Sequence, residues 1–190
     1  LAGHAENPYG HTTLGYRETE ELEAALHMLM RRRDIDANRI GLWGHSLGAY
    51  AALVAAQRFD GVKAVVLDSV YASPQDLLER ELRQLGASWV PFLKRITRLE
   101  FALYTFTYRN QRAEAELDRL AGKAKLFLTA ADQPQLTRFT RQLYEQVPEP
   151  KEYASFPRTT LSALIEDERK EYEQRVVMFF LTHLPLLRPR

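Results

Sequence analysis

Gly44-His45-Ser46-Leu47-Gly48 is the stretch that decides the fold of this chain. It follows the apolar run Arg39-Ile40-Gly41-Leu42-Trp43 and precedes a segment rich in small residues, Ala49-Tyr50-Ala51-Ala52-Leu53-Val54-Ala55-Ala56. This pattern predicts a strand, a tight turn and a helix, in that order. We expect Ser46 to occupy a strained backbone conformation at the turn, which requires very small residues on both sides of it.

A serine between two glycines at a strand-to-helix turn is the arrangement of a nucleophile elbow, which lifts the hydroxyl group above the edge of the sheet. The helix N-terminus beneath it then offers the Leu47 N–H to a developing oxyanion. The five-residue motif alone is weak, because glycine and serine are common residues. The strand and the helix around it make it specific, and the alternative is an ordinary glycine-rich turn.

The composition bounds the class of protein. A length of 190 residues suits one domain, which spans residues 1–190. The fractions of hydrophobic residues (45%) and charged residues (27%) are typical of globular proteins. A formal net charge of +1 gives no reason to expect nucleic acid as a partner. The absence of cysteine excludes disulfides and thiolate chemistry, and no apolar run reaches the roughly 18 residues of a spanning helix. No signal peptide is visible, which favours a cytoplasmic location, and the start at Leu1 predicts that the natural protein begins earlier.

Strand-like and helix-like segments alternate along the chain. Short apolar runs predict strands at 39–43, 62–68, 124–129 and 152–156, and periodic segments predict helices at 18–33, 47–58, 136–147 and 166–184. This alternation predicts an α/β fold with a mainly parallel sheet flanked by helices.

Residues 73–121 interrupt the alternation, and we interpret them as a helical cap or lid insertion. The aromatic residues of this segment favour core packing; if they instead line a cleft, the substrate is apolar. The Lys94-Arg95-x-x-Arg98 cluster is typical of a solvated helix face, with contact to a membrane surface as the alternative.

The chain as a whole resembles the α/β-hydrolase superfamily, and within it the serine hydrolases related to prolyl oligopeptidase and to esterases. The resemblance is carried by Gly3-His4-Ala5-Glu6, by the run from Asp36 to Ser46, by Leu67-Asp68-Ser69 and by the closing segment from Tyr172 to Phe180. It covers most of the chain and is weakest in 73–120. It implies the C-terminal half of that fold, a small-molecule ester or amide substrate, Ser46 as the nucleophile and no cofactor.

Two departures from the family pattern bear on function. The chain starts where the family's fourth strand ends, so we expect the first four strands and the second oxyanion N–H to be absent. The strand at 39–43 then has an open edge, which predicts a homo-oligomer through that edge or its coverage by a missing part of the protein. In addition, Leu161 stands where the family places the histidine that takes the proton of the serine.

The remaining candidate residues follow from the same resemblance. Asp132 is assigned as the triad acid, with a solvated loop aspartate, or Gln133 in that position, as alternatives. His45 is expected to point away from Ser46 and to support it by packing, and His183 to be a cation near a helix C-terminus rather than a migrated base. No metal-binding spacing of histidines occurs. The sequence therefore predicts a serine hydrolase with a degenerate triad and no more than background activity, and the alternative is a non-catalytic binding or assembly domain.

Overall fold

The computed structural model describes residues 13–84, 91–106, 113–158 and 164–184. The chain order is α1 (Tyr16–Met30), β1 (Ile40–His45), α2 (Leu47–Arg58), β2 (Val62–Asp68), α3 (Pro74–Gln84), α4 (Pro91–Tyr104), the 3-10 helix η3 (Ala113–Leu120), β3 (Ala124–Ala130), α5 (Pro134–Gln146), β4 (Lys151–Phe156) and α6 (Glu166–His183). All four predicted strands and all four predicted helices are present, with shifts of a few residues at their ends.

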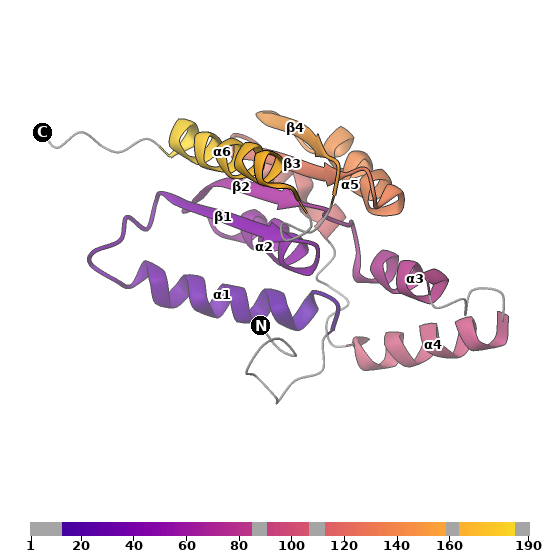
Figure 1. Ribbon diagram of the computed structural model, residues 1–190. Coiled ribbons are helices and arrows are strands. Elements are labelled where there is room, and N and C mark those ends of the chain that lie inside the picture. Colours follow the sequence, from indigo (N-terminus) through magenta and orange to yellow (C-terminus); the bar gives the residue numbers. More distant parts are fainter. Residues whose placement is uncertain (1–12, 85–90, 107–112, 159–163, 185–190) are drawn as a thin grey trace, which may run out of the picture.

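The four strands form one parallel sheet in the order β1-β2-β3-β4. Trp43 pairs with Val66, and Leu67 pairs with Phe127, so the strands end at a common edge. That carboxyl edge is the right-hand side of the sheet in Figure 1. The predicted α/β fold with a parallel sheet flanked by helices is thereby confirmed. Within the described residues β1 is an edge strand, and self-association through it stays a prediction.

Helices cover both faces of the sheet because its two central strands are apolar on both sides. In β2, Val65 and Leu67 face the core shared with α2 and α5, whereas Val66 faces the core under α6. The α6 core contains Tyr172, Val176 and Phe179. The helix α1 packs against α2 and so forms an outer layer.

Two lysines are buried at the amino end of the sheet. The Nζ atom of Lys123 donates hydrogen bonds to the carbonyls of Ala56 (2.5 Å) and Phe59 (2.8 Å), where α2 ends. The Nζ atom of Lys125 donates to the carbonyl of Leu120 (2.7 Å), the last residue of η3. Burial lowers the pKa of Lys125 to about 8. Both ammonium groups therefore satisfy carbonyls at helix C-termini, where the helix dipole favours a cation.

The helices α3 and α4 lie beyond the carboxyl ends of the strands (Figure 1), whereas η3 packs on α2 and places Leu117 and Leu120 in the main core. The expectation that the aromatic residues here are core residues is wrong for Phe92 and Phe106, whose side chains are exposed. The reason is that α4 makes few contacts with the other helices and strands, so these side chains have little to pack against. Among the described helices, none is long and apolar enough to cross a membrane.

Candidate active site

Ser46 forms the whole connection between β1 and α2. Its backbone has φ 50° and ψ −109°, in the left-handed region that non-glycine residues rarely adopt. The Ser46 N–H donates to the carbonyl of Asp68 at 2.8 Å, and the Ser46 carbonyl accepts from the N–H of Tyr50 at 3.0 Å. A conformation of this kind costs about 1–3 kcal/mol and persists only where its surroundings enforce it. The predicted strand, strained turn and helix are thus all found at this position.

The two glycines that flank Ser46 are not equivalent. A Cβ atom on Gly44 would lie 2.2 Å from the carbonyl oxygen of Gly48, so only glycine fits there. A Cβ atom on Gly48 would have no neighbour within 4 Å. The expectation that both flanking residues must be very small is therefore wrong for Gly48, which faces open space on the first turn of α2.

A buried carboxylate lies at the end of β2, next to the Ser46 turn. The Asp68 side chain accepts hydrogen bonds from the hydroxyl groups of Ser69 (2.9 Å) and Tyr172 (2.8 Å), and the residue is only 4% exposed. The indole N–H of Trp43 donates in turn to the Tyr172 hydroxyl at 3.2 Å. Ser69 also has a positive φ, 54°, and its N–H donates to the carbonyl of Leu128 at 2.9 Å. One carboxylate therefore links β1, β2 and α6 around the turn.

The electrostatics of this cluster follow from its burial. Burial raises the pKa of Asp68, and the nearby His45 together with the hydrogen bonds from Tyr172 and Ser69 partly offset the rise. Burial and the negative charge of Asp68 both raise the pKa of Tyr172 far above its ordinary value, so its hydroxyl stays a proton donor. Asp68 is not among the site residues predicted from the sequence. The available signal was an aspartate that ends an otherwise apolar strand.

Asp132 lies at the same edge of the sheet as Ser46, in the turn between β3 and α5, with β2 between their two strands. Its side chain is exposed. The side-chain oxygen of the neighbouring Gln133 accepts a hydrogen bond from Arg80 of α3 at 2.7 Å. The topology thus brings Asp132 to the predicted edge, whereas Leu161 and His4 lie outside the described residues.

Three histidines lie in the described part of the chain. His183 ends α6 and its Nε2 atom is 3.4 Å from a carboxylate oxygen of Glu152, which is near the start of β4. It therefore lies toward the amino end of the sheet, away from Ser46. His27, in the last turn of α1, packs edge-on against Phe59, where α2 ends. His45 has an exposed side chain that does not pack in the core. Of the three, only His45 is at the carboxyl edge.

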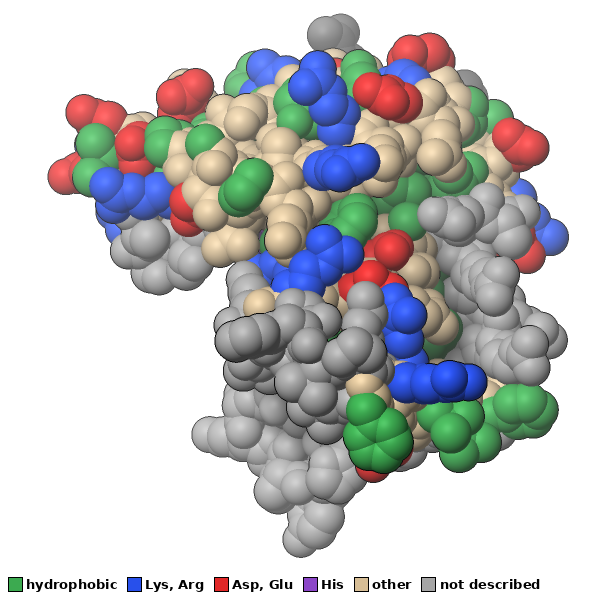
Figure 2. Space-filling model, turned by 90° about the vertical axis from the view of Figure 1, so that its right-hand side faces the viewer, with side chains coloured by type: hydrophobic (Ala, Val, Ile, Leu, Met, Phe, Trp, Pro, Cys, Tyr) green, Lys and Arg blue, Asp and Glu red, His purple; other side chains and the backbone are tan. Residues whose placement is uncertain are grey.

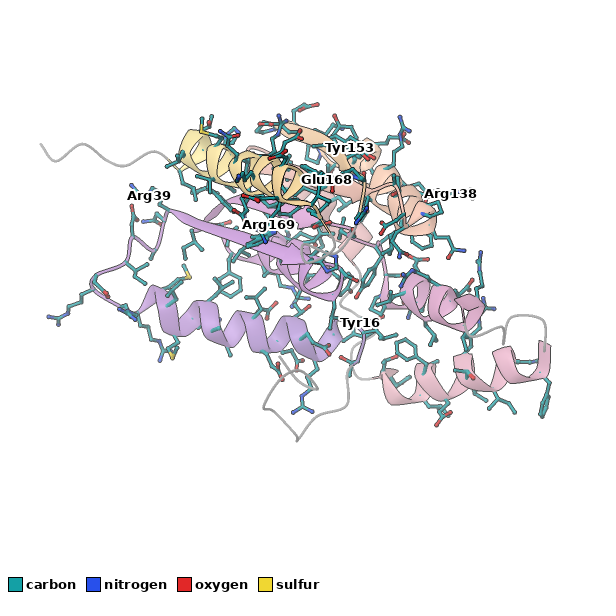
Figure 3. The ribbon with its side chains drawn as sticks, in the orientation of Figure 1. Tyr16, Arg39, Arg138, Tyr153, Glu168 and Arg169 are labelled. Atoms are coloured by element: carbon teal, nitrogen blue, oxygen red, sulfur yellow. The ribbon has the colours of Figure 1, made fainter. Side chains whose placement is uncertain are left out.

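A pocket of about 370 Å³ lies between α4 and the start of α1 and α3. Leu99, Leu103 and Phe106 form its apolar wall. On the other side the Gln75 side-chain amide donates to the hydroxyl of Tyr16 at 3.0 Å. Tyr16, at the end of α1 nearest α3 and α4 (Figure 3), also stacks edge-on against Tyr50 of α2. Over the described ranges, no group of three or more histidine or carboxylate side chains is placed to hold a metal ion.

Comparisons with known proteins place this geometry in context. Residues 1–189 match the sequence model of a family described as the alpha/beta hydrolase family. The chain is similar in structure to an esterase from Pyrococcus furiosus (TM-score 0.67, 19% identity, 95% of this chain and 68% of that one). It is also similar to a monoacylglycerol lipase from Paleococcus ferrophilus (0.61, 17%, 96% and 81%) and to a dienelactone hydrolase from Anabaena variabilis (0.60, 18%, 87% and 59%). A search of curated proteins gave no match to the sequence.

Proposed function

Because this chain belongs to the alpha/beta hydrolase family, we propose that Ser46 is the nucleophile of a site for small-molecule esters or amides. The strained turn at Ser46 carries the proposal. The turn costs free energy, and hydrogen bonds to the Asp68 carbonyl and from the Tyr50 N–H hold it in place. The esterase and lipase named among the similar structures support the same class of reaction.

The reaction assigns a role to each candidate. The Ser46 hydroxyl oxygen attacks the substrate carbonyl carbon and its proton passes to a base, while the Leu47 N–H, on the first residue of α2, donates to the new oxyanion. Collapse of the tetrahedral intermediate breaks the bond to the alcohol or amine, which leaves with a proton. Water then hydrolyses the acyl ester and returns a proton to Ser46. In this scheme Asp132 orients the base and His45 supports the turn.

The base is the deficient part of this site. Position 161, where the family resemblance places the histidine, is a leucine, and His45 is the only histidine at the carboxyl edge in the described part of the chain. Loss of one triad member typically removes roughly 10⁴- to 10⁶-fold of the rate. We therefore expect background hydrolysis from this chain. We also propose that residues 1–190 form one domain, in which residues 73–121 are the cap.

A second candidate function is a hydrolase-like domain used for binding or assembly. The hydrogen bonds of Asp68 favour it, because they tie the nearest buried carboxylate to Ser69 and Tyr172 rather than to a histidine. In this case Ser46 keeps its strained turn for structural reasons, and the pocket between α1, α3 and α4 binds a ligand without reaction.

Hydrolysis of a nitrophenyl ester tests the two candidates. We expect background turnover for the wild-type chain and a gain of about 100-fold or more for Leu161→His, since a base then becomes available. Addition of Ser46→Ala should remove that gain. Arg158→His is a matched control. It adds a histidine at an exposed position three residues before Leu161 and should give no gain.

Each result selects one candidate. Ser46-dependent turnover by the unmodified chain would contradict the degenerate site. A folded Leu161→His protein without any gain, in which Ser46 also fails to react with an activated fluorophosphonate, would favour the binding domain.

A further inference from the structure

One face of α4 carries a continuous apolar stripe that the protein leaves exposed. It consists of Phe92, Ile96, Leu99 and Leu103 on the helix and of Phe106 just beyond its end, and these side chains are 44% to 74% exposed. Figure 2, which faces the side where α3 and α4 lie, shows hydrophobic side chains beside Lys or Arg along its lower margin. The spacing of four, three, four and three residues is the heptad repeat of helices that pair with another helix.

The other face of α4 lies against α3. Phe101 is partly buried, Arg98 forms an ion pair with Glu79 of α3, and Thr105, just beyond the end of α4, is buried. In the heptad that the stripe defines, Phe101 occupies the position farthest from the paired helix. The stripe therefore lies away from the contact between α4 and α3. Its residues Leu99, Leu103 and Phe106 are 61% to 68% exposed and also border the pocket that contains Tyr16 and Gln75, so a partner helix on the stripe would cover that side of the pocket.

The charges beside the stripe indicate which partner fits. Arg95 borders the stripe on one side and Glu100 borders it on the other, and they are five residues apart. In a parallel pair of helices this spacing places Arg95 of one helix against Glu100 of the other, twice by symmetry. In an antiparallel pair like charges would meet instead. An anionic lipid surface is also less well matched, because these two flanking charges cancel.

We propose that two copies of this chain associate through a parallel pairing of their α4 helices. Ile96 and Leu103 form one set of core positions, and Phe92, Leu99 and Phe106 form the other. The combination of Ile96 in the first set with Leu99 in the second favours a two-stranded assembly. The contact covers about two heptads, so the buried area is small. The dimer is therefore weak and dissociates on dilution. This interface is separate from the edge of β1 and independent of hydrolysis at Ser46.

Sedimentation equilibrium of the full chain over a series of concentrations tests the proposal. We expect the mass to rise toward twice the 22.0 kDa of one chain, and Leu99→Asp to keep the protein monomeric. Leu181→Asp, at an equally exposed apolar position on α6, is the matched control and should leave the dimer intact. Circular dichroism verifies that both variants fold.

The orientation has its own test, because the chain contains no cysteine. Leu99→Cys should form an intermolecular disulfide under mild oxidation, since a parallel pair places this residue opposite itself, whereas Leu181→Cys should not. Arg95→Glu and Glu100→Arg should each weaken the dimer by about threefold to fivefold, and the double exchange should restore it.

Three results would overturn the proposal. The first is a chain that stays monomeric at all concentrations. The second is a dimer that survives Leu99→Asp but is lost with Trp43→Asp, which would assign it to the edge of β1. The third is a monomer that binds phosphatidylglycerol vesicles in a Leu99-dependent manner, which would make the stripe a lipid-binding face.

Discussion

Charged side chains are buried at both ends of the central sheet, but their hydrogen-bond partners differ. At the amino end, Lys123 and Lys125 donate to backbone carbonyls at helix C-termini. At the carboxyl end, Ser46 and Ser69 have positive φ angles beside the buried carboxylate of Asp68, which accepts hydrogen bonds from the side chains of Ser69 and Tyr172. The amino end pairs its charges with carbonyls at helix ends, whereas the carboxyl end has two non-glycine residues with positive φ beside a buried carboxylate. Because strained conformations of this kind cluster at functional sites, the difference supports the proposal that the site lies at the carboxyl end.

The largest effect is expected from a single methyl group at the carboxyl end. Gly44→Ala should lower the free energy of unfolding by about 3 kcal/mol or more, because its Cβ atom meets the backbone of Gly48 at 2.2 Å. Urea denaturation followed by circular dichroism measures the change. Gly48→Ala is the control and should be neutral or slightly stabilising, since its Cβ atom enters open space on a helix. Equal losses in both variants would contradict the geometry of this turn.

A pH-dependent effect is expected at the amino end. The folded-state pKa of Lys125, about 8, lies below its ordinary 10.5, so the unfolded chain binds more protons between these values. The free energy of unfolding should therefore rise with pH across this window, by an amount of the order of 3 kcal/mol.

Lys125→Met should reduce that rise to the part due to Lys123, whose pKa burial also lowers, whereas Lys63→Met, at an exposed position of β2, should retain it in full. Denaturant titrations at pH 7.5, 9 and 10.5 measure the difference (pH values spanning roughly the window between the two pKa values). A wild-type stability that is flat across this range would show that Lys125 is not buried as described.

A smaller effect of opposite sign is expected at the carboxyl end. Burial raises the pKa of Asp68, so the folded chain binds more protons than the unfolded chain above the ordinary value of 3.8. This residue thus lowers stability as pH rises through that window, and its two hydrogen bonds moderate the loss.

In Asp68→Asn the free energy of unfolding should accordingly rise more steeply with pH above about 4 than in the wild type. Asp118→Asn, at an exposed position in η3, serves as the control and should leave the profile unchanged. Identical profiles for Asp68→Asn and the wild type would mean that the carboxyl end bears no buried charge.

Much of this arrangement could be predicted from the sequence, and the failures have physical causes. The run from Ile40 to Arg58 was predictable because local composition and spacing decide a strand, a turn and a helix. The exposure of Phe92 was not, because its burial depends on how closely α4 approaches the body of the protein. The cluster of Asp68 with Tyr172 was also missed, because it joins residues 104 positions apart in the chain.

The sequence by itself determined the alternation of strands and helices, the serine turn at its centre and the membership of the alpha/beta hydrolase family. These follow from short-range periodicity and from residues that only one backbone geometry accommodates. Only the tertiary structure decided that Gly44 and not Gly48 is sterically required, that Asp68 is the buried acid beside Ser46, and that the apolar stripe of α4 stays exposed. Each of these depends on which distant segments come into contact, and that is settled by the packing of the whole chain.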